Sequence, residues 1–160
     1  EIKNQSTYWL IFELIWRDYF KYISLKHGNN IFKIGGILNK NYSWSYNKKI
    51  IKNWINGETK DDFVNANMIE LKRTGWMSNR GRQNVASYFA KELKLDWRIG
   101  AAYFESKLLD YDVHSNYGNW MYTSGVGNDP RDRKFNTQLQ AERYDPSFSY
   151  RKLWLQQTLF

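Results

Sequence analysis

Signals that end one helix and begin another recur at short intervals, and they constrain the fold of this chain more than any other feature. Gly57 and Gly75 each follow an apolar run at helical spacing, and glycine readily takes the left-handed conformation that closes a helix. Asp61 or Asp62, and later Asp96, stand just before further runs of this kind, where a short polar side chain caps the first turn. No stretch alternates apolar and polar residues over a useful strand length. The sequence therefore predicts an all-α domain.

Apolar spacing and capping residues predict helices over residues 8–25, 48–56, 61–73, 78–93, 97–109 and 150–155. In the first of these helices, Leu10, Leu14 and Phe20 form an apolar stripe, and Ser6 or Thr7 is the expected cap. The connecting segments, residues 31–46 and 110–132 and most of the chain after residue 132, are expected to be irregular but ordered.

Composition narrows the class of partner. The 160 residues fit one domain with a buried core, and the net charge of +8 predicts polyanionic partners, nucleic acid before acidic membranes. The 8 Trp, 12 Tyr and 9 Phe exceed what packing needs, which favours surfaces that stack on flat ligands or bases; large core side chains are the alternative. Without cysteine there are no disulfides and no thiolate chemistry, and no apolar run is long enough to cross a membrane.

Two arginines stand in an unusual place. Arg80 and Arg82 fall in the first turns of the helix expected from residue 78, where the helix dipole disfavours cations. This placement makes sense if an anion binds beside the exposed N–H groups. From these residues alone, two solvated arginines beside a buried Trp76 explain the pattern equally well.

The first expected helix carries a second polar and aromatic group. Glu13, Trp16, Arg17 and Phe20 lie on neighbouring faces because helical residues three and four apart are adjacent. A surface pair between Glu13 and Arg17, with Trp16 in the core, would explain this group without any function.

Several common sites are excluded by the sequence. It has no Gly-rich phosphate loop, no dinucleotide fingerprint and no nucleophile elbow, and His27 and His114 are too far apart to predict a zinc site. Residues 110–122 remain, with two carboxylates, two asparagines and several aromatics. They could hold an acid–base pair, or form Asx turns around a packed Trp120.

Four separated motifs resemble one known family. They are residues 13–17 (ELIWR), 76–82 (WMSNRGR), 95–98 (LDWR) and 110–120 (DYDVHSNYGNW). In this order, and over nearly the whole chain, they resemble the flavin-binding domain of the photolyase/cryptochrome family. Gln83, Tyr122 and residues 125–131 are similar to the DASH cryptochromes, which repair DNA chiefly in single strands.

The resemblance implies blue-light-driven repair of cyclobutane pyrimidine dimers. Reduced FAD would pass an electron to a dimer flipped out of the DNA, and the electron would return once the dimer has split. Residues expected around the flavin are Arg17, Asn79, Arg82, Asp110, Asp112 and Asn116. Residues expected at the lesion or the DNA are Glu13, Trp16, Trp76, Asn79, Arg80, Gln83, Tyr122 and Arg133.

The same resemblance implies catalytic roles. Asn116 would face the flavin N5 and influence which redox state is stable, and Glu13 would hydrogen-bond the dimer. Trp44, Trp97 and Trp120 match the family's chain of tryptophans, which carries an electron from the surface to the flavin.

Two features of the family are not found in this sequence: the N-terminal α/β domain that holds an antenna pigment, and the Ser/Thr-rich loop that binds the FAD phosphates. We therefore expect residues 1–160 to form a single domain, the C-terminal portion of the FAD-binding domain. On its own it should bind FAD weakly or not at all, and any folate antenna should be held mainly by the N-terminal domain. DNA is the expected partner of a monomer that does not bind membranes. The alternatives are a non-enzymatic flavin photoreceptor that binds nucleic acid, and a basic helical domain that coats single strands.

Overall fold

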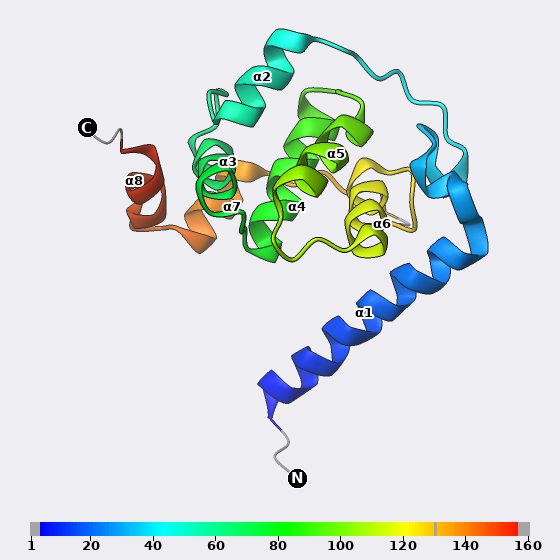
Figure 1. The fold of residues 1–160 in the computed structure, drawn as a ribbon. Coiled ribbons are helices and arrows are strands. Elements are labelled where there is room, and N and C mark those ends of the chain that lie inside the picture. The colour runs from blue at the N-terminus through cyan, green and yellow to red at the C-terminus, as the bar shows by residue number, and fades with distance from the viewer. Residues whose placement is uncertain (1–3, 130, 157–160) are drawn as a thin grey trace.

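The computed structural model describes residues 4–129 and 131–156, and over these residues the fold is helical, as predicted (Figure 1). The α-helices are α1 (Gln5–His27), α2 (Lys48–Asn56), α3 (Asp62–Thr74), α4 (Asn79–Ser87), α5 (Trp97–Lys107), α6 (Val113–Ser124), α7 (Thr137–Tyr144) and α8 (Ser149–Leu155). Two 3₁₀ turns (Gly28–Phe32 and Gly36–Leu38) follow α1, and a π-helical turn (Tyr88–Glu92) continues α4. Extended pairing in the described residues is limited to an isolated bridge between Ser45 and Leu95.

The predicted helix boundaries hold where a cap marks them. Asp61, Ser78 and Asp96 each accept a hydrogen bond from a backbone N–H in the first turn of α3, α4 and α5 respectively. Gly57 and Gly75 close α2 and α3 with φ of +70° and +71°. These three helices, with α2, therefore follow from local sequence signals.

The expected cap of α1 is wrong. Asn4, not Ser6 or Thr7, is the cap, because its Oδ1 accepts from the backbone N–H of Thr7 at 3.0 Å. The hydroxyl of Thr7 in turn accepts from the backbone N–H of Asn4 at 3.1 Å, which completes a reciprocal capping box. The helix therefore begins slightly earlier than predicted.

The expectation of irregular structure over residues 110–132 is also wrong, because α6 occupies the middle of this segment. Asp112 caps α6 by accepting from the backbone N–H of Ser115 at 2.8 Å. Gly118 lies inside the helix, where a Cβ would come within 2.2 Å of a ring carbon of Phe20 on α1. This glycine permits α1 and α6 to cross closely and does not break the helix. Helix α7, capped by Asn136, was likewise not predicted.

The core lies among α2 to α6 and contains large aromatic side chains. Its largest fully buried members are Trp54, Trp97, Trp120 and Phe89. The N-terminal end of helix α1 projects away from this core (Figure 1), and Trp16 and Phe20 pack against α6. Only Phe20 and Ser24 of α1 are buried, whereas Leu10 is 62% exposed. Of the apolar residues predicted to follow one another along this helix, Phe20 is thus buried whereas Leu10 and Leu14 are exposed. Among the described helices, none is both long and apolar enough to cross a membrane.

Candidate active site

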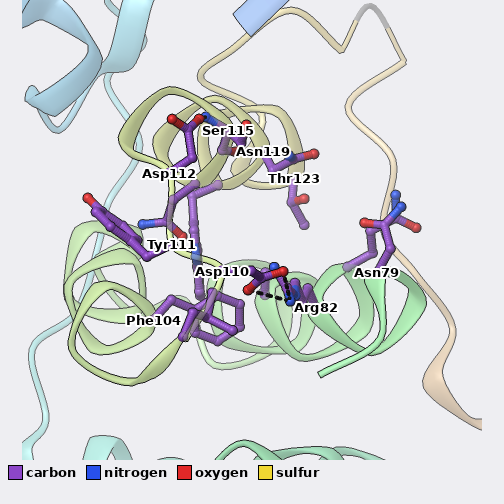
Figure 2. Close-up of a pocket in the computed structure, with 14 residues that line it drawn as sticks. Asn79, Arg82, Phe104, Asp110, Tyr111, Asp112, Ser115, Asn119 and Thr123 are labelled. Carbon is purple, nitrogen blue, oxygen red and sulfur yellow. Dashed lines mark hydrogen bonds and ion pairs between the residues drawn. The ribbon is translucent and has the colours of Figure 1, made fainter. Parts of the chain in front are cut away.

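A pocket opens between α4, α5 and α6, and we call it the inner pocket (Figure 2). Its lining residues are Asn79, Arg82, Gln83, Ala86, Phe104, Leu108, Asp110, Tyr111, Asp112, Ser115, Asn116, Asn119, Trp120 and Thr123. About 530 Å³ of empty space lies in and above this pocket, including space that is open to solvent. Apolar residues form the floor and polar groups from α4 and α6 face one another across it.

An arginine–carboxylate pair lies at one side of the inner pocket. Nη2 of Arg82 donates to both carboxylate oxygens of Asp110, at 3.0 and 2.9 Å, and its Nε donates to the carbonyl of Met77 at 2.9 Å (Figure 2). The sequence pattern predicted an anion beside Arg82. The carboxylate of Asp110 supplies part of that negative charge. Arg80 instead donates to Gln83 at 3.0 Å and stacks over the ring of Tyr144.

The pKa values of two side chains at the start of α6, Tyr111 and Asp112, are shifted from their ordinary values. Burial alone would raise the pKa of Asp112, but hydrogen bonds from Ser115 outweigh it and leave the pKa below its ordinary value. Asp112 is therefore ionised near neutral pH. Burial, followed by the charge of Glu105, raises the pKa of Tyr111 to about 12, so its hydroxyl stays protonated.

Asn116 and Trp120 line the inner pocket one turn apart on α6. Nδ2 of the buried Asn116 donates to the carbonyl of Ala101 at 3.0 Å, which orients the amide. The indole Nε1 of Trp120 is buried and has no hydrogen-bond partner within the described part of the chain. A buried donor of this kind is rare without a function or a ligand.

A second pocket, the outer pocket, adjoins the first between α1, α4 and α6. It is lined by Phe12, Glu13, Trp16, Arg17, Phe20, Asn79, Arg80, Gln83, Ser115, Asn119 and Tyr122. The two pockets share Asn79, Gln83, Ser115 and Asn119. The rings of Trp16 and Tyr122 lie 6.1 Å apart with an interplanar angle of 80°. Trp16 is half-buried and lines this pocket, so the alternative of a core position for it does not hold.

Two arginines at or beside the outer pocket, Arg17 and Arg133, bind side chains of the chain itself. Arg17 pairs with Asp18 at 3.5 Å, and no ion pair with Glu13 is present among the described residues. Arg133 donates to the hydroxyl of Tyr122, and its Nε contacts the buried Asp129 at 3.2 Å. Arg133 thus holds Tyr122 in its orientation.

The three tryptophans of the expected electron path differ in burial: Trp120 lines the inner pocket, Trp97 is fully buried and Trp44 is half-buried. Trp120 packs against α5, since a Cβ on Gly100 would lie 2.2 Å from its ring. Gly100 is one turn from the fully buried Trp97. Trp44 is half-buried, and its neighbour Ser45 is hydrogen-bonded to Lys94 and Asp96, just before Trp97. Backbone pairing therefore brings the segment of Trp44 to the start of α5.

Most of the expected site residues line one pocket or the other. The inner pocket contains Asn79, Arg82, Gln83, Asp110, Asp112, Asn116 and Trp120. The outer pocket contains Glu13, Trp16, Arg17, Asn79, Arg80, Gln83 and Tyr122. Trp76 lines neither of these pockets and is 51% exposed in the turn between α3 and α4. Arg17, expected at the flavin, lies in the outer pocket.

Several lining residues were not predicted as site residues, among them Phe12, Ser115, Asn119 and Thr123. Ser115, Asn119 and Tyr122 follow helical spacing and share one face of α6. This signal could have been found only if residues 113–124 had been predicted as a helix.

Comparison with known proteins gives a consistent result. Residues 9–158 match the family described as FAD binding domain of DNA photolyase. Proteins named Cryptochrome DASH from Natronomonas pharaonis and Danio rerio are each 56% identical, over 96% and 95% of this chain and 32% and 29% of their own lengths. The crystal structure of a cryptochrome from Synechocystis sp. is similar with a TM-score of 0.94, at 54% identity over 97% of this chain and 32% of that protein.

A more distant solved structure shares the fold. An archaeal photolyase from Sulfolobus tokodaii, solved with two FAD molecules, is similar with a TM-score of 0.86 at 34% identity, over 92% of this chain and 34% of its own. The chain spans about a third of the length of the curated relatives it matches.

Proposed function

Because this chain belongs to the family of the FAD-binding domain of DNA photolyases and most resembles its DASH cryptochromes, we propose that it is part of a blue-light-driven, FAD-dependent lyase. Its substrate would be the cyclobutane pyrimidine dimer, chiefly in single-stranded DNA. The observation that carries this proposal is the pair of adjoining pockets with a shared polar wall. A redox cofactor in the inner pocket and its substrate in the outer pocket could lie next to each other, because the two pockets share lining residues.

The inner pocket fits the isoalloxazine part of FAD. A flat ring system needs apolar surface with a few fixed polar groups. Phe104 and Leu108 supply apolar surface. Asn116 and the Arg82–Asp110 pair supply fixed polar groups. The unpartnered indole of Trp120 is a further sign that the pocket is built for a ligand. FAD, when bound, supplies the electron that light excitation makes available for transfer. The residues of this chain would bind and orient it and keep water out.

The outer pocket fits a flipped-out pair of pyrimidines. Trp16 and Tyr122 offer ring faces for stacking, and Glu13 and Gln83 offer hydrogen-bond partners for the polar edge of the bases. The exposed Arg80 at the rim can contact a phosphate, which is a sequence-independent role.

A preference for single strands follows from the same pocket. Stacking on a large ring stabilises an extruded base, and here one wall is the phenol of Tyr122 and another is the polar Gln83. The fewer large rings a pocket offers for stacking of an extruded base, the less it offsets the free energy needed to unpair a duplex. Single-stranded dimers, which require no unpairing, would therefore be favoured.

The test uses the full-length protein. We expect a flavin absorption band and loss of dimers from a single-stranded oligonucleotide under blue light. Trp16→Ala should weaken binding of the dimer by about tenfold, since stacking on one base contributes about 1–3 kcal/mol. Tyr22→Ala, which removes an exposed aromatic of the same helix outside both pockets, is the control.

Two results would contradict the proposal. A flavin band without dimer loss would favour the photoreceptor alternative. A full-length protein that binds no flavin would remove the basis of the mechanism.

A further inference from the structure

A tyrosine lies directly against the outermost tryptophan of the electron path. The rings of Tyr42 and Trp44 are edge to face, with centroids 5.6 Å apart. Both line a surface pocket together with Lys91 and Asp132. Tyrosine and tryptophan are the side chains most readily oxidised by one electron, so a contact between them at the end of such a path has a chemical consequence.

Tyr42 has a base within hydrogen-bond reach. Its hydroxyl donates to Oδ2 of Asp132 at 3.1 Å, a distance that permits proton transfer. Lys91 forms an ion pair with the other carboxylate oxygen. Burial alone would raise the pKa of Asp132, but the hydrogen bond and charge of Lys91 hold it below its ordinary value. Asp132 is therefore an ionised acceptor near neutral pH.

Trp44 itself has no such base. Its indole Nε1 is buried and lacks a hydrogen-bond partner among residues 4–129 and 131–156. Once oxidised, Trp44 has no described acceptor for its N–H proton, so it would remain a strongly oxidising radical cation. Tyr42, in contact with Trp44, can reduce this radical cation by giving it an electron.

We infer that Tyr42 is the terminal electron donor of this chain and that Asp132 takes its proton. The inference rests on the proposed function and on the tryptophan chain that the family resemblance implies. Light-excited oxidised flavin, which must be reduced before it can act in repair, would be the oxidant, and Trp120, Trp97 and Trp44 would relay the electron to it. In the final step one electron moves from the phenol of Tyr42 to the oxidised indole of Trp44. The phenolic O–H bond breaks and its proton moves to Oδ2 of Asp132, leaving neutral Trp44, a neutral tyrosyl radical and a neutral carboxylic acid.

The surrounding charges couple the electron to the proton. The ammonium groups of Lys40 and Lys91 lie 5.6 and 5.4 Å from the centre of the Tyr42 ring. Positive charge at this distance disfavours a tyrosine radical cation, so the electron leaves only as the proton leaves. Return of the electron then requires return of the proton, and the separated charge should persist longer than it would on Trp44.

The experiment is flash photolysis of the full-length, flavin-loaded protein with detection of tryptophan and tyrosyl radicals by transient absorption and electron paramagnetic resonance. The wild type should form a tyrosyl radical as the Trp44 radical decays. Tyr42→Phe keeps the ring and removes the O–H bond; it should abolish the tyrosyl signal and lengthen the life of the tryptophan radical by at least about tenfold. Tyr46→Phe, two residues beyond Trp44 and 68% exposed, is the matched control and should behave as wild type.

Asp132→Asn tests the proton acceptor separately. It should slow formation of the tyrosyl radical by about tenfold or more, and it should remove the rate difference between H₂O and D₂O seen in the wild type. A tryptophan radical whose decay is unchanged by Tyr42→Phe, or a tyrosyl radical that survives it, would overturn the inference and leave the proposed function standing. A wild type that forms no tryptophan radical at all would instead overturn the electron path and the inference with it.

Discussion

The guanidinium of Arg82 contacts two separate segments of the chain at once. Its Nε is bonded to the carbonyl of Met77, just before α4, and its Nη2 is bonded to Asp110, just before α6. Asn116 is held in a similar way by Ala101 of α5. The polar groups that face the inner pocket are thus oriented before any ligand binds, and such preorganisation reduces the entropy lost on binding.

Replacing Arg82 should loosen this arrangement. In the full-length protein, Arg82→Lys keeps the positive charge but cannot reach Met77 and Asp110 together, because an ammonium group lacks the planar fork of donors. We expect FAD affinity to fall by about tenfold, which corresponds to about 1.4 kcal/mol. Titration of the apoprotein with FAD, followed by flavin fluorescence, measures this.

Arg73→Lys is the matched control, since Arg73 is exposed at the end of α3 and lines neither pocket. Equal FAD affinity in wild type and Arg82→Lys would show that the fork geometry of Arg82 is not part of the cofactor site.

At the scale of elements, local signals predicted α2, α3, α4 and α5 but not α6 or α7. The first group has a cap at the start and, in two cases, glycine at the end, and these signals act within one turn. Helix α6 carries Gly118 in its interior, which by itself argues against a helix. The reason for that glycine is the crossing with Phe20 of α1. A contact between residues so far apart along the chain leaves no local signal.

Some residues of the inner pocket could be predicted from sequence and others could not. Resemblance to a family predicted Asn79, Arg82 and Asn116, because each lies within a motif that is similar to that family. Ser115 and Asn119 were missed because their shared face exists only if α6 is a helix. Tyr42 was missed because its partner Asp132 is distant in sequence.

Helix α8 is held to the body by a buried carboxylate that should make its docking sensitive to acid. Asp145, which is 2% exposed, accepts from the backbone N–H groups of Tyr150 and Arg151 and from Nε of Arg151. Burial would raise the pKa of Asp145, but these hydrogen bonds lower it below its ordinary value. A folded-state pKa below the unfolded one stabilises the fold above about pH 4, the unfolded value, and this contribution is lost as pH falls through the folded pKa.

Asp145→Asn should therefore weaken α8 at neutral pH. We expect the free energy of local opening over residues 149–155 to fall by about 2 kcal/mol, since buried donors lose their charged acceptor. Hydrogen exchange of the full-length protein measures this opening. The wild type, but not Asp145→Asn, should lose protection of α8 as the solution becomes acidic. Glu142→Gln, on the exposed side of α7, is the control and should retain the wild-type pH dependence.

At the scale of the whole molecule, the described chain is a helical body with one helix projecting from it (Figure 1). The outer pocket forms where α1 lies beside α4 and α6, and the packing of Phe20 on Gly118 holds α1 against α6. The N-terminal half carries exposed apolar residues that include Trp9 and Ile11. Amphipathic spacing predicted that α1 is a helix, but spacing alone does not identify the surface that a helix packs against.

The net charge of +8 should make the proposed binding of DNA dependent on salt. Each phosphate contact releases bound counterions from DNA, so the logarithm of the binding constant falls linearly with the logarithm of salt concentration, by about 0.7 per contact on single strands. Arg80 is exposed at the rim of the outer pocket and is held over the ring of Tyr144 at 5.2 Å, a fixed position from which it can contact one phosphate. In the full-length protein, Arg80→Gln should therefore reduce the salt slope for a single-stranded oligonucleotide by about 0.7 and weaken binding equally for all sequences. Arg73→Gln removes the same charge from the net total but lies outside both pockets, so it should lower affinity slightly without this change in slope. If the two variants showed the same slope, the basic surface would act only through its overall field and Arg80 would have no phosphate contact of its own.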